Sequence, residues 1–204
     1  MPMKSYIIYL PGFKTSEDMA HIALDSAIKH GWDIELYKGV NGLTQSITDY
    51  GIFANDKNAK CRESMKRPGV QGCLLSHWLL WKKCVQHNNT IGIFEHDIKF
   101  LKPVDRIVEF LDILKLEGFD LKKPRPAGNW YEGTRGYLVT PTGANKLLSW
   151  IDHNGCLPSD VQIGTDIVNI QLCEDQVIAQ QDQLHSKQSK REQSFTWNLE
   201  NITL

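Results

Sequence analysis

The sequence predicts an α/β fold in which buried strands alternate with amphipathic helices. Short, apolar, β-rich runs occupy residues 5–10 and 91–94, and a helical apolar stripe follows the first of them. Two carboxylates, Glu95 and Asp97, come directly after the second run, where a strand is expected to end. In open α/β sheets, ligands bind outside the carboxyl ends of the strands. These carboxylates are therefore the first candidate for a functional site.

The N-terminal part of the chain predicts a strand, a helix and a second strand. Residues 5–10 form the first buried strand, and Pro11-Gly12 ends it. Ser16 is expected to cap the following helix, which has acidic residues in its first turn and ends at His30-Gly31. Residues 32–37 form the second strand. This order indicates a right-handed parallel crossover.

The middle of the chain combines an irregular segment with the clearest helix. Residues 43–69 lack a period and predict a long surface excursion, either a functional lid or a solvated loop. Residues 72–87 predict a helix with Cys73 and His77 together on one face and Cys84 two turns further along. Structural zinc needs four ligands in paired clusters, and the sequence offers no second cluster. We therefore expect no zinc site, and we expect His77 to be a buried histidine with satisfied hydrogen bonds.

The second half of the chain predicts further helices and strands. Pro103 is expected to open a helix over residues 104–116. A short strand is expected at residues 136–140, a helix at 141–154 and a last strand at 177–179.

Composition points to one globular domain. The 204 residues are 41% hydrophobic and 23% charged, which suits a single sizeable core, and we expect a domain over residues 1–180 and a polar tail over 181–204. The net charge of −1 gives no global attraction to nucleic acid. No apolar run approaches the ~20 residues of a membrane-spanning helix, and the N-terminus does not read as a secretory signal. Five cysteines without a CxxC pair indicate reduced thiols, so a cytoplasmic location is expected.

Glu95 and Asp97 predict a site for a metal and a diphosphate. They stand two residues apart, so on an extended backbone both side chains lie on one face. Paired carboxylates suit Mg²⁺ or Mn²⁺, which proteins hold through one or two carboxylates together with substrate phosphates. The alternative is that both are solvated turn residues or helix caps.

Three blocks in a fixed order carry a resemblance to a known family. Residues 69–77 read Gly-Val-Gln-Gly-Cys-Leu-Leu-Ser-His, and residues 91–97 read Ile-Gly-Ile-Phe-Glu-His-Asp. Residues 133–139 read Gly-Thr-Arg-Gly-Tyr-Leu-Val, and a Gly-Ala helix follows. In this order and spacing, residues 5–180 resemble the family 25 glycosyltransferases of the lipopolysaccharide-biosynthesis type.

The resemblance implies a single Rossmann-like nucleotide-diphospho-sugar-binding domain, the A-type glycosyltransferase fold. It implies a Mn²⁺ or Mg²⁺ cofactor and a nucleotide-diphospho-sugar donor. The acceptor is expected to be a hydroxyl group, on a glycan or lipopolysaccharide by family default. Transfer of a hexosyl or pentosyl group with inversion, by direct displacement, is the reaction that the resemblance suggests.

The resemblance also assigns roles to individual residues. Asp97 matches the direct metal ligand, and Glu95 matches an acid that acts on the metal or on the donor ribose. Asp160 matches a carboxylate near the sugar or acceptor; since the acceptor hydroxyl must lose a proton, Asp160 is the first candidate base and Asp166 the second. Contacts with the donor are expected along the nucleotide side of the pocket, at Leu10, Pro11, Asn41, Gly72, Ser76, His77 and Glu95.

The chain departs from the family pattern at three places. His96 replaces the usual middle acid, and Asn41 replaces the usual aspartate of a turn. Residues 11–16 lack the arginines that the family carries after its first strand, and Lys14 is the basic residue there. These departures leave the identity of the donor open.

Other functions remain compatible with the same residues. Two acids at a strand end also suit a metal-dependent nucleotidyltransferase or phosphotransferase, and His96 with Asn41 fits a non-catalytic nucleotide-sugar-binding module. The acceptor could also be DNA that carries a hydroxylated base, because basic clusters stand at residues 57–67, 122–125 and 187–191, although such clusters are usually solvated surface. Three aromatic residues could stack on a sugar ring or a base, or simply pack in the core: Trp130, Tyr131 and Tyr137.

Overall fold

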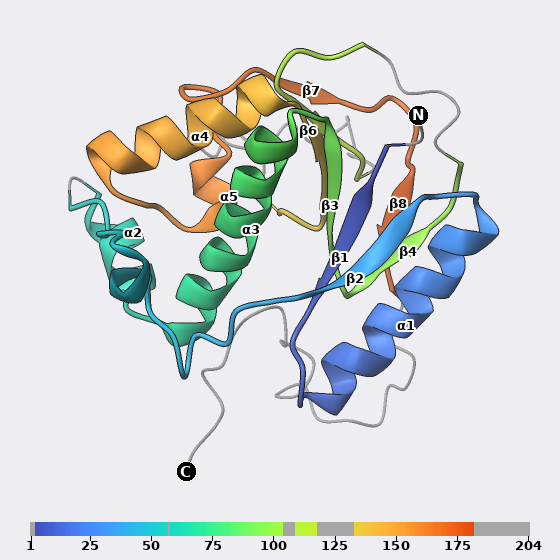
Figure 1. Cartoon of the computed structure of the whole chain (residues 1–204), viewed down its shortest axis with the longest axis horizontal. Coiled ribbons are helices and arrows are strands. Elements are labelled where there is room, and N and C mark those ends of the chain that lie inside the picture. Colours follow the sequence, from blue (N-terminus) through green and yellow to red (C-terminus); the bar gives the residue numbers. More distant parts are fainter. Residues whose placement is uncertain (1–2, 57, 104–108, 118–132, 182–204) are drawn as a thin grey trace.

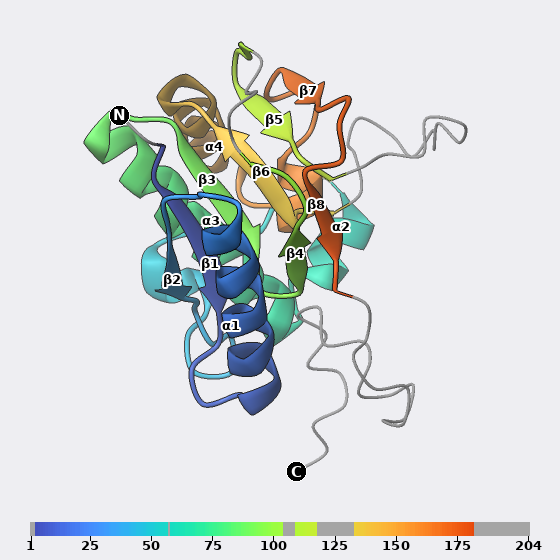
Figure 2. The same cartoon turned by 90° about the vertical axis from the view of Figure 1, so that its right-hand side faces the viewer.

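A six-stranded sheet forms the centre of the molecule (Figures 1 and 2). The computed structural model describes residues 3–56, 58–103, 109–117 and 133–181. The strand order is β2-β1-β3-β6-β5-β7, and only β6 runs against its two neighbours among these strands. The strands are β1 (Ser5–Tyr9), β2 (Ile34–Lys38), β3 (Ile91–Glu95), β5 (Ile113–Lys115), β6 (Gly136–Val139) and β7 (Ile170–Leu172). The predicted α/β class is confirmed.

Helices cover both faces of the sheet. The helices α3 (Pro68–His87) and α4 (Pro141–Asn154) pack together on one face. The other face carries α1 (Lys14–Lys29) and a small sheet made of β4 (Ile98–Phe100) and β8 (Ile178–Gln180), as Figure 1 shows. Because apolar layers lie on both sides, β1 and β3 read as continuous apolar runs rather than as alternating patterns.

The predicted crossover from β1 through α1 to β2 is confirmed, with one change at the start of the helix. α1 begins at Lys14, so Ser16 lies inside its first turn. The Ser16 hydroxyl accepts a hydrogen bond of 2.9 Å from the Leu10 backbone N–H, which ties the end of β1 to the helix. The helix ends as expected before Gly31, whose φ of +75° favours glycine.

The segment over residues 43–69 is more ordered than predicted. It contains the 3₁₀ helix η1 (Ile47–Tyr50) and the helix α2 (Ala59–Ser64). Ile47, Ile52 and Met65 are buried in the core formed with α3 and α4. The expectation of a wholly polar surface excursion is therefore wrong at these apolar positions.

The predicted helix over residues 104–116 is also wrong where the structure describes it. Ile113–Lys115 is the strand β5, which pairs with both β6 and β7. Leu111, an apolar residue within the range of that predicted helix, is 69% exposed. Residues 104–108 lie outside the described ranges, as do the aromatic positions 130 and 131, the basic clusters at 122–125 and 187–191, and the tail from residue 182.

The strand directions bring distant residues together at one edge of the sheet. β1, β3 and β5 all end at this edge, and β6 begins there because it is antiparallel to β3 and β5. The short helix α5 (Ser159–Gln162) contacts α3 at the same edge, where the Ser159 hydroxyl lies 3.1 Å from the Cys73 thiol. This is the edge at which ligands bind in open α/β sheets.

Candidate active site

Charged side chains gather in a largely buried cluster at this edge of the sheet. They come from the end of β3 and its following turn, from the end of β5, from the residues before β6 and from α5. The charges of these side chains shift one another's pKa values, so the side chains lie close together. The members of the cluster are Glu95, Asp97, Lys115, Glu117, Arg135 and Asp160. Buried charges are normally paired or bind metals, so a cluster of this kind is a candidate functional site.

Asp97 lies in the turn between β3 and β4, not on a continuous strand as expected. Its side chain is buried, and its Oδ2 accepts a hydrogen bond of 3.3 Å from Gln180. Among the described residues, its Oδ1 has no hydrogen-bond partner. Burial and the charge of Glu95 raise the pKa of Asp97 to about 7, although Arg135 opposes the shift. An aspartate with one unpaired buried oxygen has the donor chemistry of a metal ligand.

Glu95 is the last residue of β3 and faces α3. Its Oε1 accepts a hydrogen bond of 2.5 Å from the Thr134 hydroxyl and lies 3.8 Å from His77 Nε2. Burial alone would raise the pKa of Glu95, but His77 and Thr134 outweigh burial and hold it below its ordinary value. Glu95 is therefore a carboxylate that the protein keeps ionised, close enough to Asp97 to oppose ionisation there.

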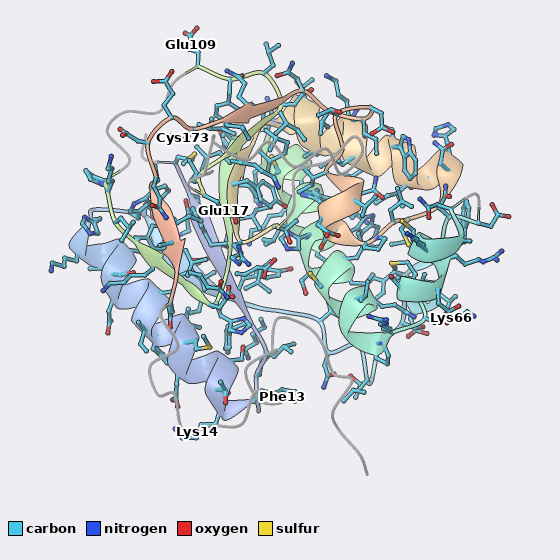
Figure 3. The ribbon with its side chains drawn as sticks, turned by 180° about the vertical axis from the view of Figure 1, so that it is seen from behind. Phe13, Lys14, Lys66, Glu109, Glu117 and Cys173 are labelled. Atoms are coloured by element: carbon cyan, nitrogen blue, oxygen red, sulfur yellow. The ribbon has the colours of Figure 1, made fainter. Side chains whose placement is uncertain are left out.

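Lys115, Glu117 and Arg135 form the β5–β6 side of the cluster. Arg135 donates to Glu117 twice, from its backbone N–H and from Nη1, both over 3.1 Å. The Lys115 ammonium donates to the Gly133 carbonyl, and burial lowers the pKa of Lys115 to about 8 against the opposing charges of Glu117 and Asp160. Figure 3 shows Glu117 near the middle of the molecule, away from the outlying Glu109 and Lys66.

The two candidate bases lie in different surroundings. Asp160, in α5, is partly buried; burial and the charge of Glu95 raise its pKa, while Lys115 lowers it. Asp166 is exposed in the turn before β7 and, within the described ranges, makes no hydrogen bond or ion pair with the cluster. The structure thus brings Asp160, and not Asp166, together with the charged cluster.

The charges of the cluster favour a bound cation. Four carboxylates (Glu95, Asp97, Glu117 and Asp160) stand against two basic side chains (Lys115 and Arg135), so the fully ionised set carries two excess negative charges. Burial together with neighbouring carboxylates raises the pKa of Asp97, Glu117 and Asp160. A divalent cation would offset the excess, and oxygen donors suit Mg²⁺ or Mn²⁺. The residues present therefore fit the divalent metal predicted from the sequence.

The nucleotide-side residues support the backbone around this edge. The Ser76 hydroxyl donates to the Gly72 carbonyl over 2.7 Å and accepts from the Val40 N–H over 2.9 Å. The Asn41 side chain accepts from the Leu43 N–H over 3.0 Å and so closes its own turn. A Cβ at Gly72 would lie 2.5 Å from the Val40 carbonyl oxygen, so this close approach requires glycine. Leu10 and Pro11 follow β1 at the same edge, Leu10 buried and Pro11 exposed.

His77 and Tyr137 lie behind the cluster in the core. Both are fully buried, and Tyr137 Oη lies 2.8 Å from His77 Nδ1 while it accepts from Trp81 Nε1 over 2.9 Å. Of the two roles considered for Tyr137, the structure supports packing in the core, because its ring is enclosed by protein. His77 is buried as expected, but its Nε2 has no hydrogen-bond partner within the described part of the chain. His96 is buried too, and burial lowers its pKa.

Gln181 holds the turn that carries Asp97. Its side-chain amide donates to the carbonyls of Met19, His96 and Ile98 over 2.8, 3.1 and 2.8 Å. Its backbone N–H donates to the Asp97 carbonyl over 2.7 Å. The last described residue thus joins α1 to the β3–β4 turn.

Sequence reasoning missed Lys115, Glu117 and Thr134 as members of the site. Lys115 and Glu117 stand two apart in the run Asp-Ile-Leu-Lys-Leu-Glu, a spacing that is visible in the sequence and typical of one strand face. The helical interpretation of residues 104–116 concealed it. Thr134 could be recognised only through its contact with Glu95, which depends on the pairing of β6 with β3.

Comparison with known families identifies the chain. The sequence model for Glycosyltransferase family 25 (LPS biosynthesis protein) matches residues 6–124, which is more than half of the chain. The chain belongs to glycosyltransferase family 25. The predicted family resemblance is thereby confirmed; the match includes the first two sequence blocks, and the third block, residues 133–139, lies outside it. The matched residues include the Ser76-His77 block, Glu95, Asp97 and both charged residues of the β5 segment, Lys115 and Glu117.

Two proteins of Haemophilus influenzae are similar to part of the chain. One is "Lipooligosaccharide biosynthesis protein lex-1", 29% identical over 131 residues, which cover 48% of this chain and 41% of the relative. Another carries the name "Putative glycosyltransferase" and is 33% identical over 127 residues, covering 53% of this chain and 43% of the relative. The chain thus spans less than half the length of either relative.

The family and the architecture agree on one mixed α/β domain of the glycosyltransferase type, with the site at the expected edge of the sheet. As for membranes, none of the helices within the described ranges combines the length and apolar character needed to cross a bilayer.

Proposed function

We propose that this chain is a metal-dependent glycosyltransferase that moves a sugar from a nucleotide-diphosphate donor to a hydroxyl group of a glycan acceptor in lipopolysaccharide or lipooligosaccharide biosynthesis. Family membership and the names of the two relatives support the reaction and the acceptor class. The observation that carries the metal dependence is the buried Asp97 Oδ1, which has no partner among the described residues and lies in a cluster with excess carboxylates.

Each residue of the cluster has a task in this proposal. Asp97, whose Oδ1 has no hydrogen-bond partner among the described residues, would hold Mn²⁺ or Mg²⁺, and the ionised Glu95 adds negative charge beside it. A bound divalent cation stabilises the charge that develops on the leaving diphosphate. Asp160 accepts the proton of the acceptor hydroxyl, because its raised pKa makes it a stronger base than an ordinary aspartate. Two backbone N–H groups, those of Val161 and Asp160, and the positive charge of Lys115 favour the ionised form of Asp160 against burial.

The donor is expected to lie over the ends of β1 and β3. Asn41, Ser76 and Gly72 shape the backbone of this edge, and Leu10 and Pro11 bound it. The Ser76 hydroxyl is already hydrogen-bonded to two backbone groups, so its contribution is to position residues 39–42 rather than to bind the nucleotide through its side chain.

A thermal-shift panel of nucleotide sugars with and without Mn²⁺ tests the proposal. A donor that binds the folded chain raises its melting temperature, and the rise is expected to need the metal and to disappear in Asp97→Asn. The active donor is then incubated with acceptor glycans, and free nucleoside diphosphate is measured. Release of pyrophosphate instead would indicate a nucleotidyltransferase, and binding without turnover under either metal would indicate a non-catalytic module. Salt-sensitive binding of duplex DNA would indicate that the acceptor is a nucleic acid instead of a glycan.

A further inference from the structure

Three side chains with metal-binding atoms meet on the side of β3 that faces α3. Cys73 and His77 stand one helical turn apart on α3, and Glu95 reaches them from the end of β3. One ligand atom of each residue lies within 4.8 Å of the others. All three residues are buried, with exposed fractions of 6%, 0% and 5%. The sequence shows the Cys73–His77 pair but does not show that the fold supplies a third ligand.

His77 is held in the orientation of a metal ligand. Its Nδ1 lies 2.8 Å from the Tyr137 hydroxyl, which is itself fixed by Trp81. Its Nε2 points toward Glu95 at 3.8 Å, too far for a hydrogen bond, and has no other partner among the described residues. A fully buried ring nitrogen that makes no hydrogen bond is costly, and the 3.8 Å contact with Glu95 does not supply one.

Each of the three ligands also has its own supporting partner. The Ser159 hydroxyl lies 3.1 Å from Cys73 Sγ, Tyr137 holds His77, and Thr134 donates to Glu95. Metal-binding side chains are typically oriented in this way by hydrogen bonds from a surrounding shell of residues. Each of the three candidate ligands therefore has the supporting hydrogen-bond partner that is typical of a metal site.

We propose that Cys73, His77 and Glu95 supply three of the four ligands of one Zn²⁺ between α3 and the end of β3, with a water molecule as the fourth. Thiolate and imidazole donors select Zn²⁺ over Mg²⁺ and Mn²⁺, which prefer oxygen. A thiolate and a carboxylate together carry two negative charges, so Zn²⁺ makes the set neutral, as a buried site requires. The Cys73 thiol gives up its proton on binding, and the Ser159 hydroxyl then donates to the thiolate.

This site adjoins the Asp97 site, because Glu95 borders both, but it does not rest on the proposed transferase activity. It uses a thiolate and an imidazole together with the Glu95 carboxylate, whereas the Asp97 site has carboxylate oxygens alone. Its ligands are enclosed by protein, so the ion enters as the chain folds. The ion would fix α3 against β3 immediately before the turn that carries Asp97.

Metal content and cobalt spectroscopy test the inference on the full chain. The chain is produced with added Zn²⁺ or Co²⁺ and purified without chelator. We expect about one zinc per chain and, in the cobalt form, a thiolate-to-cobalt charge-transfer absorption band. Cys73→Ser should hold roughly tenfold less metal and lose the band. Cys84→Ser is the matched control, because Cys84 is a buried cysteine of the same helix; it should keep both.

Two results would overturn the zinc site. One is wild-type chain that holds less than about a tenth of an equivalent of zinc and shows no charge-transfer band, a result that needs no variant to fold. The other is a folded Cys73→Ser variant with as much metal as Cys84→Ser. Asp97→Asn separates the two metal assignments: it should keep the cobalt band while losing Mn²⁺-dependent stabilisation by the donor. If the wild-type chain lacks the cobalt band but keeps Mn²⁺-dependent stabilisation by the donor, the zinc proposal is wrong and the transferase proposal is unaffected.

Discussion

Thr134 donates a 2.5 Å hydrogen bond from its hydroxyl to the Glu95 carboxylate, joining the residues before β6 to the end of β3. The two residues are 39 positions apart and meet because β6 runs antiparallel to β3. The same segment supplies the Gly133 carbonyl to Lys115 and the Arg135 side chain to Glu117. One short stretch of chain therefore organises both sides of the charged cluster.

Asp97→Asn is expected to stabilise the metal-free chain at alkaline pH. The pKa of Asp97 in the folded chain, about 7, lies above its ordinary value of 3.8. The folded state thus retains a proton that the unfolded state has lost, and stability falls as pH rises from about 4 to 7. At pH 8 the variant should gain roughly 1–3 kcal/mol in free energy of unfolding. Urea unfolding at several pH values measures the gain, which should shrink as the pH is lowered from 7 toward 4; a variant less stable than wild type at pH 8 contradicts this account.

Asp160→Asn is expected to slow sugar transfer while leaving donor binding intact. A general base typically contributes about 10²–10⁴ in rate, so the loss in kcat should fall in that range. The matched comparison is Asp166→Asn, because Asp166 is exposed and lies apart from the cluster. Steady-state kinetics and donor thermal shifts are measured on both variants. A larger loss in Asp166→Asn would move the base to that residue.

Lys115→Met is expected to move the acidic limb of the pH–rate profile to higher pH. Lys115 lowers the pKa of Asp160, so removing its charge lets that pKa rise. The direction of the shift follows from the loss of an opposite charge beside a partly buried carboxylate. The exposed Lys29 provides the control, since it lies in the last turn of α1 and Lys29→Met should leave the profile unchanged. An unmoved profile in Lys115→Met would separate Lys115 from the base.

Gly42→Ala is expected to cost more stability than Gly31→Ala. A Cβ at Gly42 would lie 1.7 Å from the Pro68 carbonyl oxygen, so the start of α3 must move away from the β2 turn. We expect a loss of about 3 kcal/mol or more. At Gly31 no described atom lies within 4 Å, and only the φ of +75° disfavours alanine, at a cost of about 1 kcal/mol. Urea unfolding ranks the two variants, and equal losses would argue against the close approach.

The parts of the fold predicted correctly from sequence are those with local signals. The strands over Ser5–Tyr9 and Ile91–Glu95 have continuous apolar runs, and α1 ends at a glycine with positive φ. For the strand β5 the sequence predicts a helix, because the apolar spacing of residues 107–114 fits a helical period as well. Its true pairing is with β6 and β7, and pairing between distant segments leaves no local mark.

The candidate site divides in the same way. Glu95 and Asp97 were recognisable because acidic residues stand out after an apolar run. The sequence does not show that the two acids have different surroundings. Because β3 ends at Glu95, Asp97 lies in a turn, where it faces Arg135 and Gln180. Glu95 instead faces α3. A spacing of two residues predicts that both side chains lie on one face of a strand. That prediction requires the strand to continue to Asp97, whereas β3 ends at Glu95 and the turn follows directly.

The contacts of Gln181 mean that any shortened form of the chain must include residue 181. Its side chain joins the first helix to the loop that carries Asp97, so the beginning and the end of the described chain are clasped together at the point where chemistry is proposed to occur. A gene shortened by even a few codons inside this limit would release that loop before it removed any residue that binds a ligand. Expression designs and fusion junctions should therefore leave residue 181 and its immediate surroundings intact.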